Sequence, residues 1–160
     1  METITRAAGG VAVTLRGDGR RLEVTLRDST GLARDLEALG RALWAARTRA
    51  VLDAAGLAAE PVVAGWRAEA YVAGRAAIVA RGRSLDGLVA VQATGMRRWR
   101  VHVAPGASAA AVREAGEALI EDQARQIRAL KRTIWQPEGT GNARRARESW
   151  WDIPGTGGSQ

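Results

Sequence analysis

The chain contains no cysteine and no phenylalanine, and only one histidine and one tyrosine among its 160 residues. The lack of cysteine excludes a disulfide framework, thiolate catalysis and cysteine-ligated metal. Aromatic residues make up only 4% of the chain, so alanine, valine, leucine and isoleucine must build most of its core. Apolar residues reach 46%, which is enough for one small domain or two very small ones.

Long apolar runs are also missing. No run approaches the roughly 20 residues that span a bilayer. Residues 1–10 lack the basic, apolar and small-residue order of a signal peptide. We therefore expect a cytoplasmic protein, located with the nucleoid if it binds DNA, and no membrane partner.

Residues suited to catalysis are scarce. The single histidine, His102, falls in an alternating strand pattern beside Arg100, where a structural or solvated role is far more common than a catalytic one. Glu121 and Asp122 are neighbours on a predicted helix and point in different directions, so they do not form a paired-carboxylate site. No glycine-rich phosphate loop is present. The sequence predicts a non-enzymatic protein without a cofactor or a metal.

Positive charge is what the chain has in excess. Its net charge is +7 and its isoelectric point is about 11.3. All but one of its 24 basic residues are arginine, the exception being Lys131. A coding bias toward arginine explains that preference but not the excess over acidic residues. A basic balance favours polyanionic partners such as nucleic acid.

The first half of the chain predicts strands followed by a helix. Residues 2–6 form a short strand and residues 7–10 a flexible connection. Residues 11–15 and 22–26 alternate between apolar and polar side chains, which is typical of half-buried strands. The Asp18-Gly19 pair between them favours a tight turn.

A helix follows these strands. Its apolar stripe consists of leucines at 32, 36, 39 and 43, which recur at spacings of three and four. Ser29 or Thr30 can cap its start. Gly56 and Pro61 mark its end.

The second half repeats this order. Residues 57–77 are a linker or a short helix, and residues 78–83 are a candidate strand. Residues 89–94 and 99–103 alternate on either side of a turn opened by Gly95. Ser108 can then cap a helix of roughly 26 residues, about 40 Å long.

The two halves form an internal repeat. Residues 11–13 align with 89–91 at an offset of 78, Gly17 falls on Gly95, and residues 22–26 align with 99–103 at an offset of 77. One unit buries its sheet and its helix stripe poorly, whereas two units can cover each other. The sequence predicts an α+β fold in which two small antiparallel sheets, each with a long helix, pack as an internal pseudo-dimer. The expected segments are 1–56 for the first repeat, 57–77 for the linker or short helix, 78–135 for the second repeat and 136–160 for a flexible tail.

Four segments make up the repeated pattern: residues 8–19 and 22–28 in the first copy, and residues 84–91 and 99–105 in the second. These segments supply a glycine-rich approach, an alternating strand, a tight glycine turn and a return strand before a long helix. In this pattern the repeated unit resembles the YbaB/EbfC family of nucleoid-associated proteins. The resemblance implies a three-stranded sheet with flanking helices and DNA binding with little sequence preference. Two copies in one chain imply a pseudo-dimer, although exchange between two chains as a homodimer is also open.

Arginines in both turns and on the last helix are the candidate contacts to double-stranded DNA. They are Arg16, Arg20, Arg21, Arg97, Arg98, Arg100, Arg125, Arg128, Lys131 and Arg132. Such side chains neutralise phosphates without reading sequence. With about six contacts, affinity would fall roughly a thousandfold between 50 and 200 mM salt.

A protein-interaction adaptor or chaperone is the alternative function, and the family resemblance implies that it could be accessory to a specialised secretion system. Such a protein would bind its partner through a sheet or helix face and through Trp150 and Trp151, two adjacent tryptophans in the polar tail that are suited to docking on a protein surface. This alternative predicts no useful DNA affinity at physiological salt.

Overall fold

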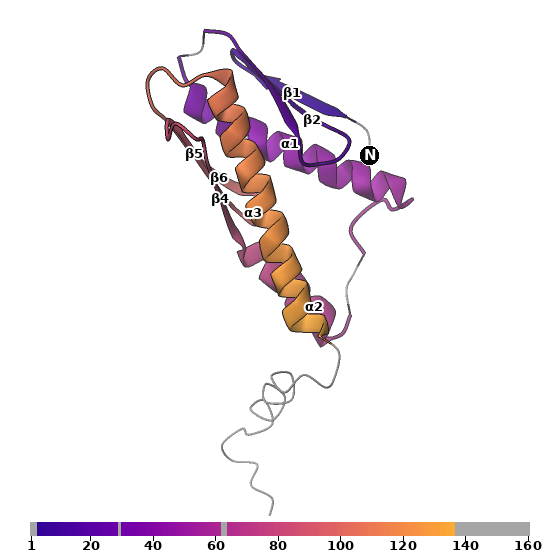
Figure 1. Ribbon diagram of the computed structural model, residues 1–160. Coiled ribbons are helices and arrows are strands. Elements are labelled where there is room, and N and C mark those ends of the chain that lie inside the picture. Colours follow the sequence, from indigo (N-terminus) through magenta and orange to yellow (C-terminus); the bar gives the residue numbers. More distant parts are fainter. Residues whose placement is uncertain (1–2, 29, 62–63, 137–160) are drawn as a thin grey trace, which may run out of the picture.

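A computed structural model describes residues 3–28, 30–61 and 64–136 of the chain. Figure 1 shows two strand–strand–strand–helix units, with an additional helix leading into the second. The elements are β1 (Ile4–Ala8), β2 (Val11–Leu15), β3 (Leu22–Leu26), α1 (Leu32–Ala54), α2 (Trp66–Ala77), β4 (Val79–Arg83), β5 (Val89–Thr94), β6 (Arg98–Val103) and α3 (Ala109–Trp135).

Each unit forms its own three-stranded antiparallel sheet. The first sheet has the order β1-β2-β3 and the second has the order β4-β5-β6. Val13 lies opposite Val24 in the first sheet, and Val91 lies opposite Val101 in the second. These are the partners that the internal repeat predicts, so the α+β fold of a duplicated sheet-plus-helix unit is confirmed.

The two units share one core because their helices cross over to each other. Helix α1 packs on β1 and β2 of its own sheet and also on β6, while α3 packs on β4 and β5 and also on β3. The most deeply buried large side chains come from both halves: Val11, Leu15, Val89 and Leu119. A small apolar cavity of about 70 Å³ lies where both sheets and both helices meet. The internal pseudo-dimer is therefore a single hydrophobic unit.

A glycine on each helix makes the crossing possible. A Cβ atom on Gly40 of α1 would lie 2.5 Å from ring atoms of Trp99 on β6, and one on Gly116 of α3 would lie 2.5 Å from a methyl carbon of Leu22 on β3. Leu22 and Trp99 are equivalent positions of the repeat. The Trp99 ring is further fixed by its Nε1–H, which donates to the Met96 carbonyl at 3.0 Å.

Carboxylates on the helices accept hydrogen bonds from backbone N–H groups at the outer edges of three strands. The Leu22 N–H of β3 donates to Glu117 at 2.9 Å, and the Val101 N–H of β6 donates to Glu37 at 3.1 Å. On β4, the Arg81 N–H donates to Asp122 at 2.9 Å. Open strand edges invite pairing with other chains, and these bonds occupy part of each edge.

Helix α2 belongs to the second unit. It packs on the end of α3, where Gly74 lies against Leu130 and the ring centroids of Tyr71 and Trp135 are 5.3 Å apart. The segment predicted as a linker or short helix is thus helical from Trp66 onward. Trp135 keeps 47% of its surface exposed despite this contact.

Two boundary predictions are wrong. Ala7 and Ala8 were expected in a flexible connection, but they pair with Ala12 and Val11 and extend β1 to a two-residue turn. Thr30 was a candidate cap, but Gly31 occupies the N-cap of α1 without a side-chain bond, and Ser29 lies outside the described residues. The cap at Ser108 is confirmed, because its Oγ accepts from the Ala111 N–H at 3.1 Å.

Replacing Gly40 and Gly116 with alanine should lower the free energy of unfolding by different amounts. Gly40→Ala should lower the free energy of unfolding by about 1–3 kcal/mol, because the new methyl meets a rigid, anchored indole. Gly116→Ala should cost less than about 1 kcal/mol, since the Leu22 methyl can move and alanine favours the helix. Urea unfolding of both variants measures the difference, and equal losses would contradict it.

The bond from Asp122 to β4 predicts a pH-dependent contribution to stability. Burial raises the pKa of Asp122, but bonds from the Arg81 N–H, Gln126 and Arg125 outweigh it and leave the pKa below its usual value. A lowered folded-state pKa stabilises the fold above the unfolded value of about 3.9, and this stabilisation is lost as the pH falls through the folded value.

Asp122→Asn should therefore destabilise the protein at pH 7 by about 1 kcal/mol, and the loss should shrink below about pH 4. Glu121→Gln is the matched control, because Glu121 forms an exposed pair with Arg128 and its removal should cost less. Unfolding titrations at pH 3 and pH 7 separate the two variants. A loss for Asp122→Asn that does not change with pH would refute the linkage.

Candidate nucleic-acid interface

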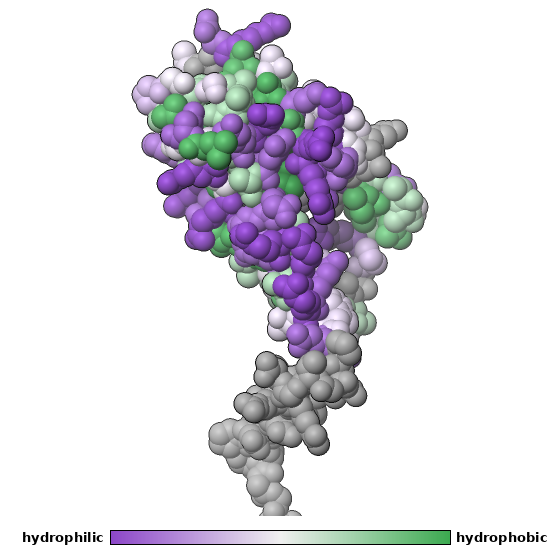
Figure 2. Space-filling view, in the orientation of Figure 1, coloured by the Kyte–Doolittle hydropathy of each residue, from purple (hydrophilic) through white to green (hydrophobic). Residues whose placement is uncertain are grey.

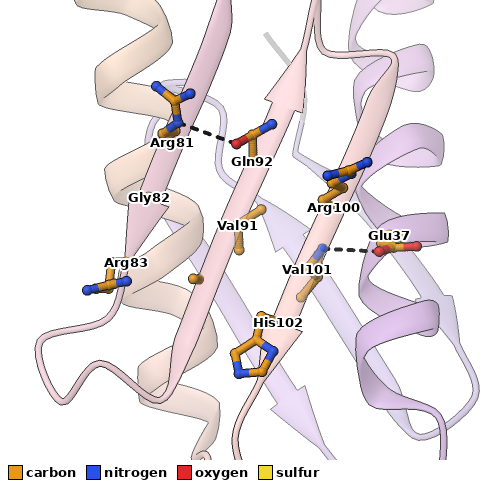
Figure 3. Close-up of a pocket in the computed structure, with 10 residues that line it drawn as sticks. Glu37, Arg81, Gly82, Arg83, Val91, Gln92, Arg100, Val101 and His102 are labelled. Carbon is orange, nitrogen blue, oxygen red and sulfur yellow. Dashed lines mark hydrogen bonds between the residues drawn. The ribbon is translucent and has the colours of Figure 1, made fainter.

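The side of the second sheet that faces away from the helices gathers arginines. The alternation along β4, β5 and β6 turns Ala80, Val91 and Trp99 toward the core and their neighbours outward. Three rows of paired residues make up this outer side, hereafter the basic face: Arg81–Gln92–Arg100, Arg83–Ala90–His102 and Val79–Thr94–Arg98. Figure 3 shows the first two rows in front of the sheet, with the helices behind it.

A shallow groove of about 710 Å³ runs over the middle of the basic face. Its floor is low because the outward side chain of Ala90, at its centre, is only a methyl group. Arg81 and Arg83 line it from β4, and Arg100 and His102 line it from β6. The groove is open to solvent and wide enough to admit part of an extended ligand.

Hydrogen-bond donors dominate the groove. The Arg81 Nε–H donates to the Gln92 Oε1 at 3.3 Å, which leaves the Gln92 amide N–H groups for other partners. Glu37 of α1 brings a carboxylate to the rim, where it accepts the Val101 N–H at 3.1 Å. Among the described residues, no carboxylate forms an ion pair with Arg81, Arg83 or Arg100.

The equivalent face of the first sheet carries little charge. Its rows are Thr5–Thr14–Glu23 and Ala7–Ala12–Thr25. Thr5 and Thr14 share a hydroxyl hydrogen bond of 2.9 Å, and Glu23 is paired with Arg16. The two repeats therefore have the same backbone but different outer surfaces.

The turn between β4 and β5 holds one side of the basic face in place. Asp86 accepts from the Ser84 hydroxyl at 2.6 Å and from the Leu88 N–H at 3.0 Å. These bonds, led by the one from Ser84, lower the pKa of Asp86, so the carboxylate stays ionised and keeps the turn closed. Leu85 N–H also donates to Glu114 of α3 at 3.0 Å.

The predicted arginine set divides into paired and unpaired members. Arg16 pairs with Glu23, Arg21 with Asp18 at 3.8 Å, Arg125 with Asp122 and Arg128 with Glu121 at 3.2 Å. These four side chains have their charge partly offset by a neighbour. Hydrophilic residues cover the side of α3 that faces the viewer in Figure 2, but basic and acidic side chains are mixed there.

The remaining members lie in three places. Arg98 and Arg100, which were grouped with Arg97 of the turn, lie on strand β6 and belong to the basic face. Arg20 and Arg97 are exposed in the turns. Lys131 lies 5.8 Å from the Tyr71 ring centroid, and Arg132 is exposed near the end of α3. Trp150 and Trp151 lie outside the described residues.

Arg81, Arg83 and Gln92 were missed in the sequence. The segment of residues 78–83 was expected to be a strand, but its two faces were not assigned. The alternation of Ala80 and Gly82 with Arg81 and Arg83 was the available signal, because small residues on one side allow α3 to approach. Gly82 lies directly against the backbone of Ala115 and Leu119.

No protein-family model matches the chain, and no curated protein or solved structure matches it significantly. Within residues 3–28, 30–61 and 64–136, no group of three or more metal-ligating side chains comes together. No helix in the same described part is long and apolar enough to cross a membrane.

Proposed function

We propose that the chain is a tandem YbaB/EbfC-like protein that binds double-stranded DNA with little sequence preference. The observation that supports this best is the basic face, where four arginines stand on β4 and β6, the two strands that flank β5, and form no ion pair with a carboxylate among the described residues. The net charge of +7 acts in the same direction at longer range.

The chemistry of the face suits phosphate contact. Arginine guanidinium groups donate to phosphate oxygens and release the counterions that surround DNA, which gives affinity that does not depend on base sequence. The arginines stand on the face of a three-stranded sheet, which is broader than the single helix or two-stranded ribbon that enters the major groove, so we assign them to phosphates and not to base edges. The proposed mechanism is attachment to the DNA backbone.

A protein-interaction role is the second candidate. Trp66 and Val72 of α2 and Trp135 of α3 are 63%, 48% and 47% exposed. Exposed tryptophans of this kind are frequent anchors in protein interfaces. A chain that fails to bind DNA even at 50 mM salt would favour this role over the first.

The DNA proposal predicts a specific salt dependence. If the four arginines of the basic face each neutralise one phosphate, the slope of log affinity against log salt is about −3.6, and affinity falls roughly 150-fold between 50 and 200 mM salt. Fluorescence anisotropy with a labelled random-sequence duplex at 50, 100 and 200 mM salt measures the slope. Binding that does not change with salt would overturn the mechanism.

Variants in which one arginine is replaced by glutamine show which arginines contact the DNA phosphates. Arg100→Gln should reduce the salt slope by about 0.9, because one phosphate contact is lost. Arg16→Gln is the matched control, since Arg16 is already paired with Glu23 on the first sheet, and the slope should stay unchanged. Equal effects of the two variants would place the contacts outside the basic face.

A further inference from the structure

We infer that the hollow over Ala90, at the centre of the basic face, is a discrete oxyanion site for one phosphate group. The inference rests on the proposed function, because it names the part of the basic face that holds a phosphate. A discrete site would also bind a free oxyanion and would become saturated. Arginines that only attract anions in general would respond to ionic strength alone.

The shape of the hollow comes from the register of the second sheet. Ala90 lies directly between Arg83 on β4 and His102 on β6, so a methyl group stands where the two flanking strands carry long side chains. Arg81, Gln92 and Arg100 form the adjacent row and close the hollow along the strand direction. Figure 3 shows these side chains around the open centre of the groove.

The hydrogen bond between Arg81 and Gln92 fixes the orientation of the Gln92 amide. Because the Gln92 Oε1 accepts from Arg81, the amide nitrogen is turned toward β6 and Arg100 (Figure 3). Arginine has donors and no acceptor. The guanidinium groups of Arg83 and Arg100 and the amide of Gln92 therefore line the groove with donors, and a tetrahedral oxyanion has the acceptors that such groups bind.

Within the part of the chain that the structure describes, Glu37 is the one acidic side chain that lines the groove. It comes from α1 behind the edge of the sheet, and its carboxylate accepts the Val101 N–H at 3.1 Å. This bond holds the carboxylate at the rim. The positive groups of β4 and β6 thus outnumber it around the hollow.

Two ligands share the chemistry that the site recognises. A phosphodiester of a DNA backbone and a free phosphate ion or monoester both offer tetrahedral oxyanions. The first repeat supplies matched controls, because Ala12 and Thr14 occupy the positions of Ala90 and Gln92 on the outer face of the first sheet.

The test titrates the full chain with inorganic phosphate at constant ionic strength, with chloride as the balancing ion, and follows the backbone amide NMR signals of Ala90, Gln92 and His102. We expect saturation with a dissociation constant of about 1 mM, as for a few charge-assisted hydrogen bonds in solvent. Ala90→Leu and Gln92→Glu should weaken phosphate binding at least about tenfold. Ala12→Leu and Thr14→Glu should change it less than about twofold.

The outcomes separate this inference from the DNA proposal. Shifts that grow linearly without saturating, together with duplex binding by Ala90→Leu at the wild-type level, overturn the discrete site and leave DNA binding standing. Saturation that Gln92→Glu abolishes, without duplex binding at 50 mM salt, supports the site and removes DNA as its ligand. Circular dichroism verifies the fold of each variant, and Gln92→Glu decides the test if Ala90→Leu does not fold.

Discussion

The contact of each long helix with the third strand of the opposite sheet is the interaction on which the rest of the structure depends. Helix α1 covers β6 and helix α3 covers β3, so each sheet is completed by a helix from the other repeat. The contact is close because Gly40 and Gly116 leave room for Trp99 and Leu22. Burial of apolar surface across this crossing is shared by the two repeats, and neither half encloses a comparable core alone.

This arrangement also explains why the outer faces of the sheets are available for function. Both helices lie on the inner sides, and their carboxylates reach around to bond Leu22, Arg81 and Val101 at the strand edges. The strands are thereby held on their inner side, and their outward side chains do not fill the core. In the second sheet these outward positions include arginine, glutamine and histidine.

Much of the fold was predictable because period-two and period-3.6 patterns, turn glycines and the Ser108 cap are local signals. The internal repeat predicted that the two halves pack against each other. Helix α2 was harder to predict, because Gly74 weakens a helical pattern until Leu130 is known to lie against it. The site was predicted only in part. Arg98 and Arg100 were named, but which arginines are neutralised depends on partners such as Glu23 and Asp122, and these pairings across strands and helix turns follow from the folded geometry.

The joining of both repeats by the segment between α1 and α2 has a further consequence. Two separate copies of such a unit would assemble by a second-order reaction and would fall apart on dilution, whereas a linked pair meets at an effective concentration in the millimolar range. Assembly of this core is therefore independent of protein concentration. Separate identical subunits would also repeat every surface substitution twice, while a single chain can give its two halves different faces, as Thr14 and Gln92 illustrate at one position of the repeat.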